Sequence, residues 1–199
     1  AQYIIIATGS EPISLPGIEL NGTNILNNQQ ILELQEPPKN LLIIGGGVTS
    51  AEFASIFSMF QTETTIAEVS DRILRGADPD ISAEIERVFS RKNIKILKNT
   101  RIQPQQIGNF EKVLIATGRK PAISRLNLEN IGMKTDKRAI ITNDFMQTNL
   151  SHVFAIGDVA GKAMLAYTAD REGRIVAEKI LGKNPQPINY DAIPYTIFS

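Results

Sequence analysis

Short runs rich in isoleucine, valine and leucine recur along the chain, each four or five residues long and ending at or near a glycine or a charged residue. Runs of this length and composition are typical of strands buried in a parallel sheet. The pattern therefore predicts strands at residues 3–7, 41–44, 64–67, 94–97, 112–116 and 153–156.

Apolar residues spaced three and four apart predict helices between these strands. One predicted helix carries Phe53, Ile56, Phe57 and Phe60 on one face, and the next carries Ile81, Ile85, Val88 and Phe89. The second has clear end signals, because Asp78 can cap it, Pro79 suits its first position, and Arg91 and Lys92 complement the negative end of its dipole. Strands that alternate with helices predict a doubly wound α/β sheet.

Proline-bearing stretches without periodicity interrupt this alternation at residues 11–22, 36–38 and 182–194. Such stretches favour crossings between domains over sheet interior. Two strands also end alike, since Thr8 and Gly9 follow the first run and Thr117 and Gly118 follow the run at 112–116. A Thr-Gly terminus lets backbone approach a ligand at the strand ends, where open α/β sheets bind cofactors, although both could be plain turns.

Composition narrows the classes of partner. Lysine plus arginine and aspartate plus glutamate number 21 each, so no net field favours nucleic acid or an anionic membrane. The apolar runs are too short to span a bilayer, and we expect a cytoplasmic protein whose partners are small molecules. The cysteine count is zero, which excludes a disulfide framework, a cysteine-ligated zinc site and thiol chemistry carried by this chain, and we predict no metal site.

A glycine-rich turn after strand 41–44 runs straight into the first predicted helix. It comprises Gly45, Gly46, Gly47, Val48, Thr49, Ser50, Ala51 and Glu52. Gly45 permits a tight turn, Gly47 has no side chain to hold a pyrophosphate away, and the helix start favours phosphate charge. Ser50 stands where the usual motif has a third glycine, and it is small enough to let helix and strand pack closely.

The next strand ends at Glu68, near the offset of about twenty residues at which an acid accepts hydrogen bonds from adenosine ribose hydroxyls. The glycine-rich turn and an acid at this offset together favour a dinucleotide site over a plain turn with a solvated glutamate. A carboxylate there would repel the extra phosphate of NADP, so we predict NAD as the cofactor. Arg72 and Arg75 lie just downstream and could restore phosphate binding.

Five segments together resemble the pyridine nucleotide-disulfide oxidoreductases, and most closely their dihydrolipoamide dehydrogenase branch. They are IIIATGSEP, IIGGGVTSAEF, IAEVSDRIL, VLIATGRKP and VFAIGDVAGKAMLAYTADREG. The resemblance implies a Rossmann-like doubly wound NAD domain inserted in a split FAD-binding domain. It assigns residues 1–27 to an FAD-domain segment and crossover, 28–112 to the NAD domain, 113–187 to the FAD domain and 188–199 to the start of a dimerisation domain.

The resemblance also assigns cofactor contacts. On the FAD side these are Thr8, Gly9, Ser10 and Asp158, with Met164, Leu165, Ala166 and Tyr167 at the N-terminus of a helix that meets the flavin ring and runs to about Leu181. Tyr167 departs from the family, which often has histidine there. On the NAD side they are Gly45 through Glu52, Glu68, Gly118 and, more weakly, Ile102.

Two residues keep two interpretations, and a third has one. Glu52 would lie near the nicotinamide by resemblance, or would be a first-turn acid that complements the helix dipole. Arg119 would contact a cofactor phosphate or be solvated beside Pro121. His152 suits a surface or strand-edge role, and we assign no catalytic residue to the chain.

In the family, electrons pass from a dithiol through an active-site disulfide and FAD to NAD, and a partner subunit supplies a histidine. The resemblance implies that the first FAD-binding glycine turn and the redox cysteines would precede Ala1, and that the histidine would follow Ser199. It also implies a parent homodimer, with a 2-oxoacid dehydrogenase complex as a candidate assembly. Between Thr100 and Val113 the chain is about twenty residues shorter than the family pattern, as though part of a small β-meander were absent.

Two alternatives remain at this stage. The chain could act alone as a noncatalytic NAD-binding module, or the parent could be another relative such as an NADH oxidase, a mercuric reductase or a glutathione reductase. The last normally has basic residues in place of Glu68. We expect this 199-residue chain to bind NADH but to transfer no hydride, because its FAD site is incomplete.

Overall fold

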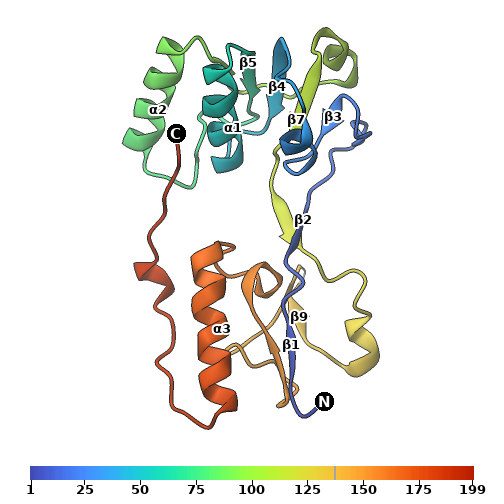
Figure 1. The fold of residues 1–199 in the computed structure, drawn as a ribbon, viewed down its shortest axis with the longest axis vertical. Helices are drawn as coiled ribbons and strands as arrows, with labels where there is room; N and C mark the ends of the chain where they lie inside the picture. The colour runs from blue at the N-terminus through green and yellow to red at the C-terminus, as the bar shows by residue number, and fades with distance from the viewer. Residues whose placement is uncertain (137) are drawn as a thin grey trace. The chain divides into compact units, whose positions relative to one another are not determined.

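The computed structural model describes residues 1–136 and 138–199, which form two compact units (Figure 1). The inserted unit comprises Pro12–Gly118 with Thr196–Ser199, and the outer unit comprises Ala1–Glu11 with Arg119–Tyr195. One unit is thus interrupted in sequence by the other, as the resemblance implies. The boundaries differ from those expected at 27 and 112, because the strand that begins at Lys112 pairs inside the inserted unit.

The inserted unit is built on a five-stranded parallel sheet. Its strands are β3 (Ile25–Leu26), β4 (Asn40–Ile44), β5 (Glu63–Ala67), β6 (Lys95–Leu97) and β7 (Lys112–Ile115), in the spatial order β3-β7-β4-β5-β6. Ile43 of β4 lies beside Ile66 of β5 and Leu114 of β7. The predicted strands of this unit are therefore present, with ends shifted by a residue.

Alternate residues of β4 face opposite sides of the sheet. Leu41 and Ile43 pack with α1 (Val48–Met59) and α2 (Pro79–Arg91). Leu42 and Ile44 instead face a layer that includes Ile18 and Ile107, the latter in the 3-10 helix η2 (Pro104–Asn109). A second 3-10 helix, η1, spans Gln30–Glu33. The fold class is a parallel α/β sheet as predicted, with both of this unit's α-helices on one face and only a short helix and loops on the other.

The helix faces differ in part from the predicted stripes. In α1, Phe53 and Phe57 are buried but Ile56 is 38% exposed, and Phe60, which caps the C-terminus of the helix, is 60% exposed. The buried face is completed by small residues, Ser50, Ala51, Ala54 and Ser55, which let the helix lie close to the sheet. In α2, Phe89 is fully buried whereas Ile81 is 49% exposed. A stripe defined by large apolar residues alone therefore pointed slightly off the true contact face.

The helix ends follow the sequence signals unevenly. Asp78 is the N-cap of α2 and Pro79 its first residue, but the Asp78 side chain makes no capping hydrogen bond. Helix α1 ends at Met59, and Gln61 then adopts a left-handed backbone with φ of 62°. A non-glycine residue carries a steric cost in that conformation.

The outer unit contains a parallel pair, β1 (Ile4–Ile6) with β11 (Val153–Ala155), and the long helix α3 (Ala166–Ile180). Strand β2 (Ser10–Pro12), whose last residue belongs to the inserted unit, pairs with β8 (Arg119–Pro121). The outer unit also contains the hairpin β9 (Thr135–Asp136) and β10 (Ala139–Ile140), and the 3-10 helices η3 (Leu128–Ile131), η4 (Gly157–Ala160) and η5 (Tyr190–Ala192). The prediction of a buried strand at 3–7 is wrong, since Ile4 and Ile5 are 44% and 46% exposed. Among residues 1–136 and 138–199, strand β1 pairs with β11 alone, so its faces lack the cover that parallel strands usually have.

Candidate dinucleotide site

The strand order creates a switch point between β4 and β7. From β4 the chain proceeds outward through β5 to β6, whereas β7 lies on the other side of β4. Ligands of open α/β sheets bind beyond the carboxyl ends of strands at such a point. Here the residues beyond β4 and β7 line a cavity of about 220 Å³, namely Gly45 to Thr49 and Ala116 to Gly118, together with Glu68.

The first two positions of the turn require glycine, because neighbouring atoms lie too close to leave room for a Cβ. Gly45 has φ of 110°, and a Cβ there would lie 2.4 Å from the Ala116 carbonyl oxygen. A Cβ on Gly46 would lie 2.9 Å from the Glu68 carboxylate. The Gly46 amide donates to Glu68 Oε2 at 2.6 Å, and its carbonyl accepts from the Leu74 amide at 2.6 Å. The turn is therefore held by the Glu68 carboxylate and the Leu74 amide.

The third glycine opens onto free space. Gly47 is the N-cap of α1, it is exposed, and a Cβ built on it would meet nothing within 4 Å. The first amides of the helix have no partner within it, and no acidic residue occupies the first turn. The helix dipole and these amides together suit the negative charge of a pyrophosphate.

Ser50 and Ala51 lie beneath the turn. Ser50 is 0% and Ala51 1% exposed, so the position that usually holds a third glycine is packed against the sheet. Serine is small enough for this contact. The departure from the usual motif thus leaves the geometry of the turn in place.

Glu68 is half-buried beyond the end of β5. Its Oε2 accepts from the Gly46 amide, and its Oε1 accepts from the Ser70 amide at 2.7 Å. A carboxylate has about four lone-pair sites, so both oxygens can still accept from ribose hydroxyls. The two amides hold the carboxylate in a fixed orientation at the edge of the cavity.

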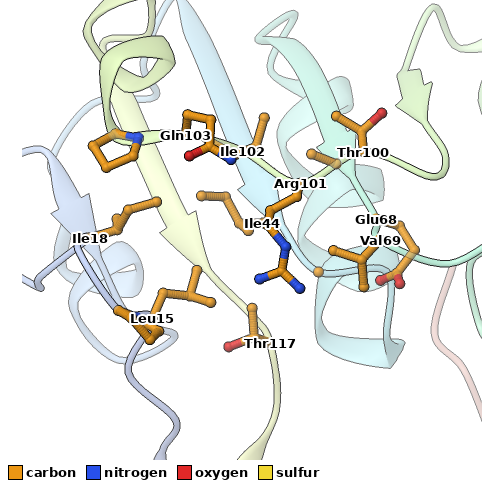
Figure 2. Close-up of a pocket in the computed structure, with 14 residues that line it drawn as sticks. Leu15, Ile18, Ile44, Glu68, Val69, Thr100, Arg101, Ile102, Gln103 and Thr117 are labelled. Atoms are coloured by element: carbon orange, nitrogen blue, oxygen red, sulfur yellow. The ribbon is translucent and has the colours of Figure 1, made fainter.

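Figure 2 shows a second cavity, of about 370 Å³. It shares Gly45, Glu68 and Thr117 with the first cavity. Its walls are largely apolar: Leu15, Pro16, Ile18, Ile44, Ala67, Val69, Ile102 and Pro104. The shape suits a flat apolar group attached to the sugar at Glu68. Ile102, the weaker sequence candidate, lines this wall.

Arg72 and Arg75, the two downstream arginines, are engaged by their own loop. Arg72 donates to the carbonyl oxygens of Ala77 at 3.0 Å and Arg75 at 3.3 Å, and Arg75 donates to Ser70 Oγ at 3.4 Å. The cation that enters the larger cavity is instead Arg101, which the sequence had not singled out (Figure 2).

Glu52 lies beyond the first turn of α1, which contains no acidic residue. Its interpretation as a first-turn acid is therefore wrong. Its Oε1 accepts from the Phe198 amide at 3.1 Å. Glu52 does not line either cavity near the glycine turn.

In the outer unit, three sequence candidates join into one network. Ser10 Oγ donates to Asp158 Oδ2 at 2.5 Å, and Arg119 donates from Nε to Ser10 Oγ at 2.7 Å and from its terminal nitrogen to the Ser10 carbonyl at 2.6 Å. Arg119 is thus bound to the Ser10 segment, and its interpretation as a solvated side chain is wrong. The network orients the Asp158 carboxylate in η4.

The other candidates of this unit lie at two places. Thr8 and Gly9 are tied to Ala122, because Thr8 Oγ1 donates to its carbonyl at 3.0 Å and its amide donates to the Gly9 carbonyl at 2.9 Å. The segment Met164 to Tyr167 forms the start of α3, with Leu165 as N-cap. Tyr167 donates its hydroxyl to the Pro194 carbonyl. His152 is exposed and precedes β11, where its carbonyl accepts from the Ile4 amide at 2.9 Å.

Glu172 is a buried acid that sequence reasoning missed. It is 1% exposed on α3, and its carboxylate accepts from the Gly157 amide at 2.5 Å and the Tyr190 hydroxyl at 2.7 Å. Burial, followed by this hydrogen bond, raises the pKa of Tyr190. The signal was present, since Glu172 lies three and four residues before Ile175 and Val176, on the buried face.

Across residues 1–136 and 138–199, no helix is long and apolar enough to cross a membrane, and no group of three or more histidine, cysteine, aspartate and glutamate side chains could hold a metal ion. The charged side chains that line the two cavities of the inserted unit are one carboxylate, Glu68, and one guanidinium, Arg101. Such groups bind and orient a ligand.

Comparison with known proteins gives consistent results. A family model described as pyridine nucleotide-disulphide oxidoreductase matches residues 1–173. Dihydrolipoyl dehydrogenases from Bacillus subtilis and Chlamydia pneumoniae are 35% identical over 217 residues and 37% identical over 213, and each match covers 100% of this chain and 46% of the relative. The chain therefore spans about half the length of the curated relatives it matches.

Solved structures show the same fold. LpdA from Mycobacterium tuberculosis gives a TM-score of 0.90 at 25% identity, covering 100% of this chain and 47% of its own. The HOCl-induced flavoprotein disulfide reductase RclA from Escherichia coli gives 0.86 at 28% identity, covering 98% and 49%.

Proposed function

The chain belongs to the pyridine nucleotide-disulphide oxidoreductase family, and on that premise we propose that its inserted unit binds NAD and its outer unit forms part of an FAD site. The relatives with closely similar sequences are dihydrolipoyl dehydrogenases. We infer that the parent protein passes electrons from a dithiol, such as dihydrolipoamide, through a disulfide and FAD to NAD. We further propose a cytoplasmic homodimer that serves a 2-oxoacid dehydrogenase complex.

The observation that carries the NAD assignment is the cavity at the switch point. It combines an open Gly47, the amides at the start of α1, which have no partner within the helix, and a fixed carboxylate at Glu68. Pyrophosphate needs the first two, and the ribose hydroxyls need the third. The residues present therefore fit the adenosine diphosphate half of a dinucleotide.

Glu68 supports NAD over NADP. Its carboxylate is held by two amides, so it cannot readily turn away from a ligand. Ribose hydroxyls donate to it favourably, whereas the 2′-phosphate of NADP would meet it as a like charge. Arg72 and Arg75 are already hydrogen-bonded within their own loop, so their positive charge is less available to a 2′-phosphate.

The outer unit's residues support part of an FAD site. Ser10 and Arg119 orient Asp158, whose carboxylate can accept from hydroxyls of a flavin cofactor. The start of α3 presents backbone amides and the positive end of its dipole, as the family's flavin contact requires. Bound FAD would supply the electron-accepting ring, and these residues would hold and orient it. The exposed Ile4 and Ile5 fit a sheet that further strands cover in the parent protein.

Calorimetric titration of the 199-residue chain with NADH and NADPH tests the proposal. We expect tighter binding of NADH, and no stoichiometric flavin in the purified chain. Glu68→Arg should weaken NADH by roughly 10-fold or more and reverse the preference, because it removes charge-assisted hydrogen bonds worth about 1.5–3 kcal/mol.

Glu63→Arg is the matched control, since Glu63 is an exposed acid at the opposite end of the same strand. It should leave both affinities unchanged. Tighter binding of NADPH by the unmodified chain would contradict the NAD assignment, and unchanged selectivity in Glu68→Arg would remove Glu68 from the site.

A further inference from the structure

We propose that Arg101 is a second determinant of cofactor choice, opposite in sign to Glu68. Its guanidinium binds a 2′-phosphate on the adenosine ribose, so the site accepts NADPH as the weaker of two ligands. The inference rests on the proposed function, because it requires a dinucleotide at the glycine turn. Arg101, rather than Arg72 or Arg75, then supplies the positive charge for such a phosphate.

The position of Arg101 is fixed by the backbone beside Glu68. The Thr100 amide donates to the Glu68 carbonyl at 2.8 Å, and the Asn99 amide donates to the Ser70 carbonyl at 2.8 Å. The segment that follows β6 is therefore tied to the segment that follows β5. Arg101 is the next residue, and it lines the same cavity as Glu68.

The side chain of Arg101 projects into this cavity (Figure 2). It is exposed, and it makes no hydrogen bond or ion pair with any residue among 1–136 and 138–199. Its charge is therefore available to a ligand. The neighbouring walls are mostly apolar, so a phosphate in the cavity has Arg101 as its one cationic side chain among the residues that line it.

The other charges near the cavity are already engaged. Glu68 accepts from the Gly46 and Ser70 amides and forms no ion pair with Arg101 in the described part of the chain. Arg75 is hydrogen-bonded to Ser70. A ligand in this cavity would therefore contact both the fixed Glu68 carboxylate and the Arg101 guanidinium.

The chemistry of the two groups separates the two cofactors. NADPH differs from NADH only by the 2′-phosphate, which a planar guanidinium can bind through two parallel hydrogen bonds. Glu68 opposes that phosphate and Arg101 attracts it. The preference for NAD is then a balance between two side chains, and removing either one should move the two affinities differently.

Four proteins test the balance: the unmodified chain, Arg101→Met, Glu68→Gln and the double variant, each titrated with NADH and NADPH at one fixed ionic strength. Methionine keeps much of the length of the arginine side chain without its charge. We expect Arg101→Met to weaken NADPH by roughly 10-fold while NADH changes by less than about twofold. Glu68→Gln should strengthen NADPH, and adding Arg101→Met should remove that gain.

Arg75→Met is the matched control for a general loss of positive charge, and both affinities should be unchanged in it. An Arg101→Met chain that binds NADPH as tightly as the unmodified chain overturns the inference. An equal loss of NADH and NADPH also overturns it, because Arg101 would then contact a part common to both. If the unmodified chain binds neither cofactor, the proposed function itself fails; if NADH binding responds to Glu68→Arg but NADPH ignores Arg101→Met, only this inference fails.

Discussion

Replacing Glu172 with leucine should destabilise the outer unit, because two hydrogen-bond donors would lose their acceptor. The carboxylate accepts from the Gly157 amide and the Tyr190 hydroxyl, and leucine can accept from neither. Gly157 directly precedes Asp158, so the same acceptor also fixes the backbone that carries the candidate flavin contact. The substitution therefore probes folding and the site together.

The magnitude follows from the donors left without a partner. A buried donor that loses its acceptor costs about 1–3 kcal/mol, so two would cost about 2–6 kcal/mol. Both donors belong to residues that are only half-buried and can recover some hydration. We therefore expect Glu172→Leu to lower the free energy of unfolding by about 2–3 kcal/mol, and Glu172→Gln, which keeps an acceptor oxygen, by about 1 kcal/mol.

Urea unfolding monitored by tyrosine fluorescence reports on the outer unit. The chain has no tryptophan, and its four tyrosines, Tyr3, Tyr167, Tyr190 and Tyr195, all belong to the outer unit. Circular dichroism, which reports both units, provides the comparison. The signal of the inserted unit should be unchanged by Glu172→Leu.

A double-mutant cycle makes the reasoning refutable. Tyr190→Phe should cost about 1 kcal/mol in the unmodified chain and almost nothing beside Glu172→Leu, because the hydroxyl has by then lost its acceptor. Asp170→Asn, in an exposed ion pair with Arg174 on the same helix, should cost at most about 0.5 kcal/mol. Equal effects of Tyr190→Phe in both backgrounds, or a cost for Glu172→Leu no larger than that of Asp170→Asn, would refute the account.

Two further predictions concern stability. Gln61→Gly should stabilise the chain by about 0.5–1 kcal/mol in urea unfolding, because Gln61 has φ of 62°; Asn93→Gly, at φ of 57° after α2, should gain less since asparagine tolerates this conformation. A gain in Asn93→Gly equal to or above that in Gln61→Gly would contradict this. The raised pKa of Tyr190 keeps its hydroxyl neutral in the folded state, so its contribution is complete below about pH 10, where unfolded tyrosine ionises, and is lost as pH rises further. The unfolding midpoint of the unmodified chain should therefore fall faster than that of Tyr190→Phe above that pH, and parallel curves would count against the assignment.

The glycine turn and Glu68 could be predicted because their signals are local. A strand, three glycines, a helix and a second strand lie within residues 40–68, and each has a sequence pattern of its own. The face of α1 was harder to predict, since small residues such as Ala51 and Ala54 are almost fully buried while Phe60, just beyond the end of the helix, is exposed. Size and hydrophobicity alone do not distinguish these positions.

The network in the outer unit could not be predicted from the sequence as a set of contacts. Ser10 lies 148 residues from Asp158 and 109 from Arg119, and only the folded chain brings them together. Arg101 was missed for a related reason, because its role depends on the cavity that two neighbouring loops form. Glu172 was different, since helical periodicity places it on an apolar face where an acid needs partners.

The most direct test of the central claim is NADH titration of Gly47→Val. Gly47 has an extended backbone with φ of −81°, and a Cβ built there meets nothing within 4 Å. The valine variant should therefore fold normally, and its side chain should occupy the space proposed for the pyrophosphate. The account predicts that the unmodified chain binds NADH and that Gly47→Val, at an unchanged melting temperature, does not. Tight NADH binding by Gly47→Val, or none by the unmodified chain, would contradict it.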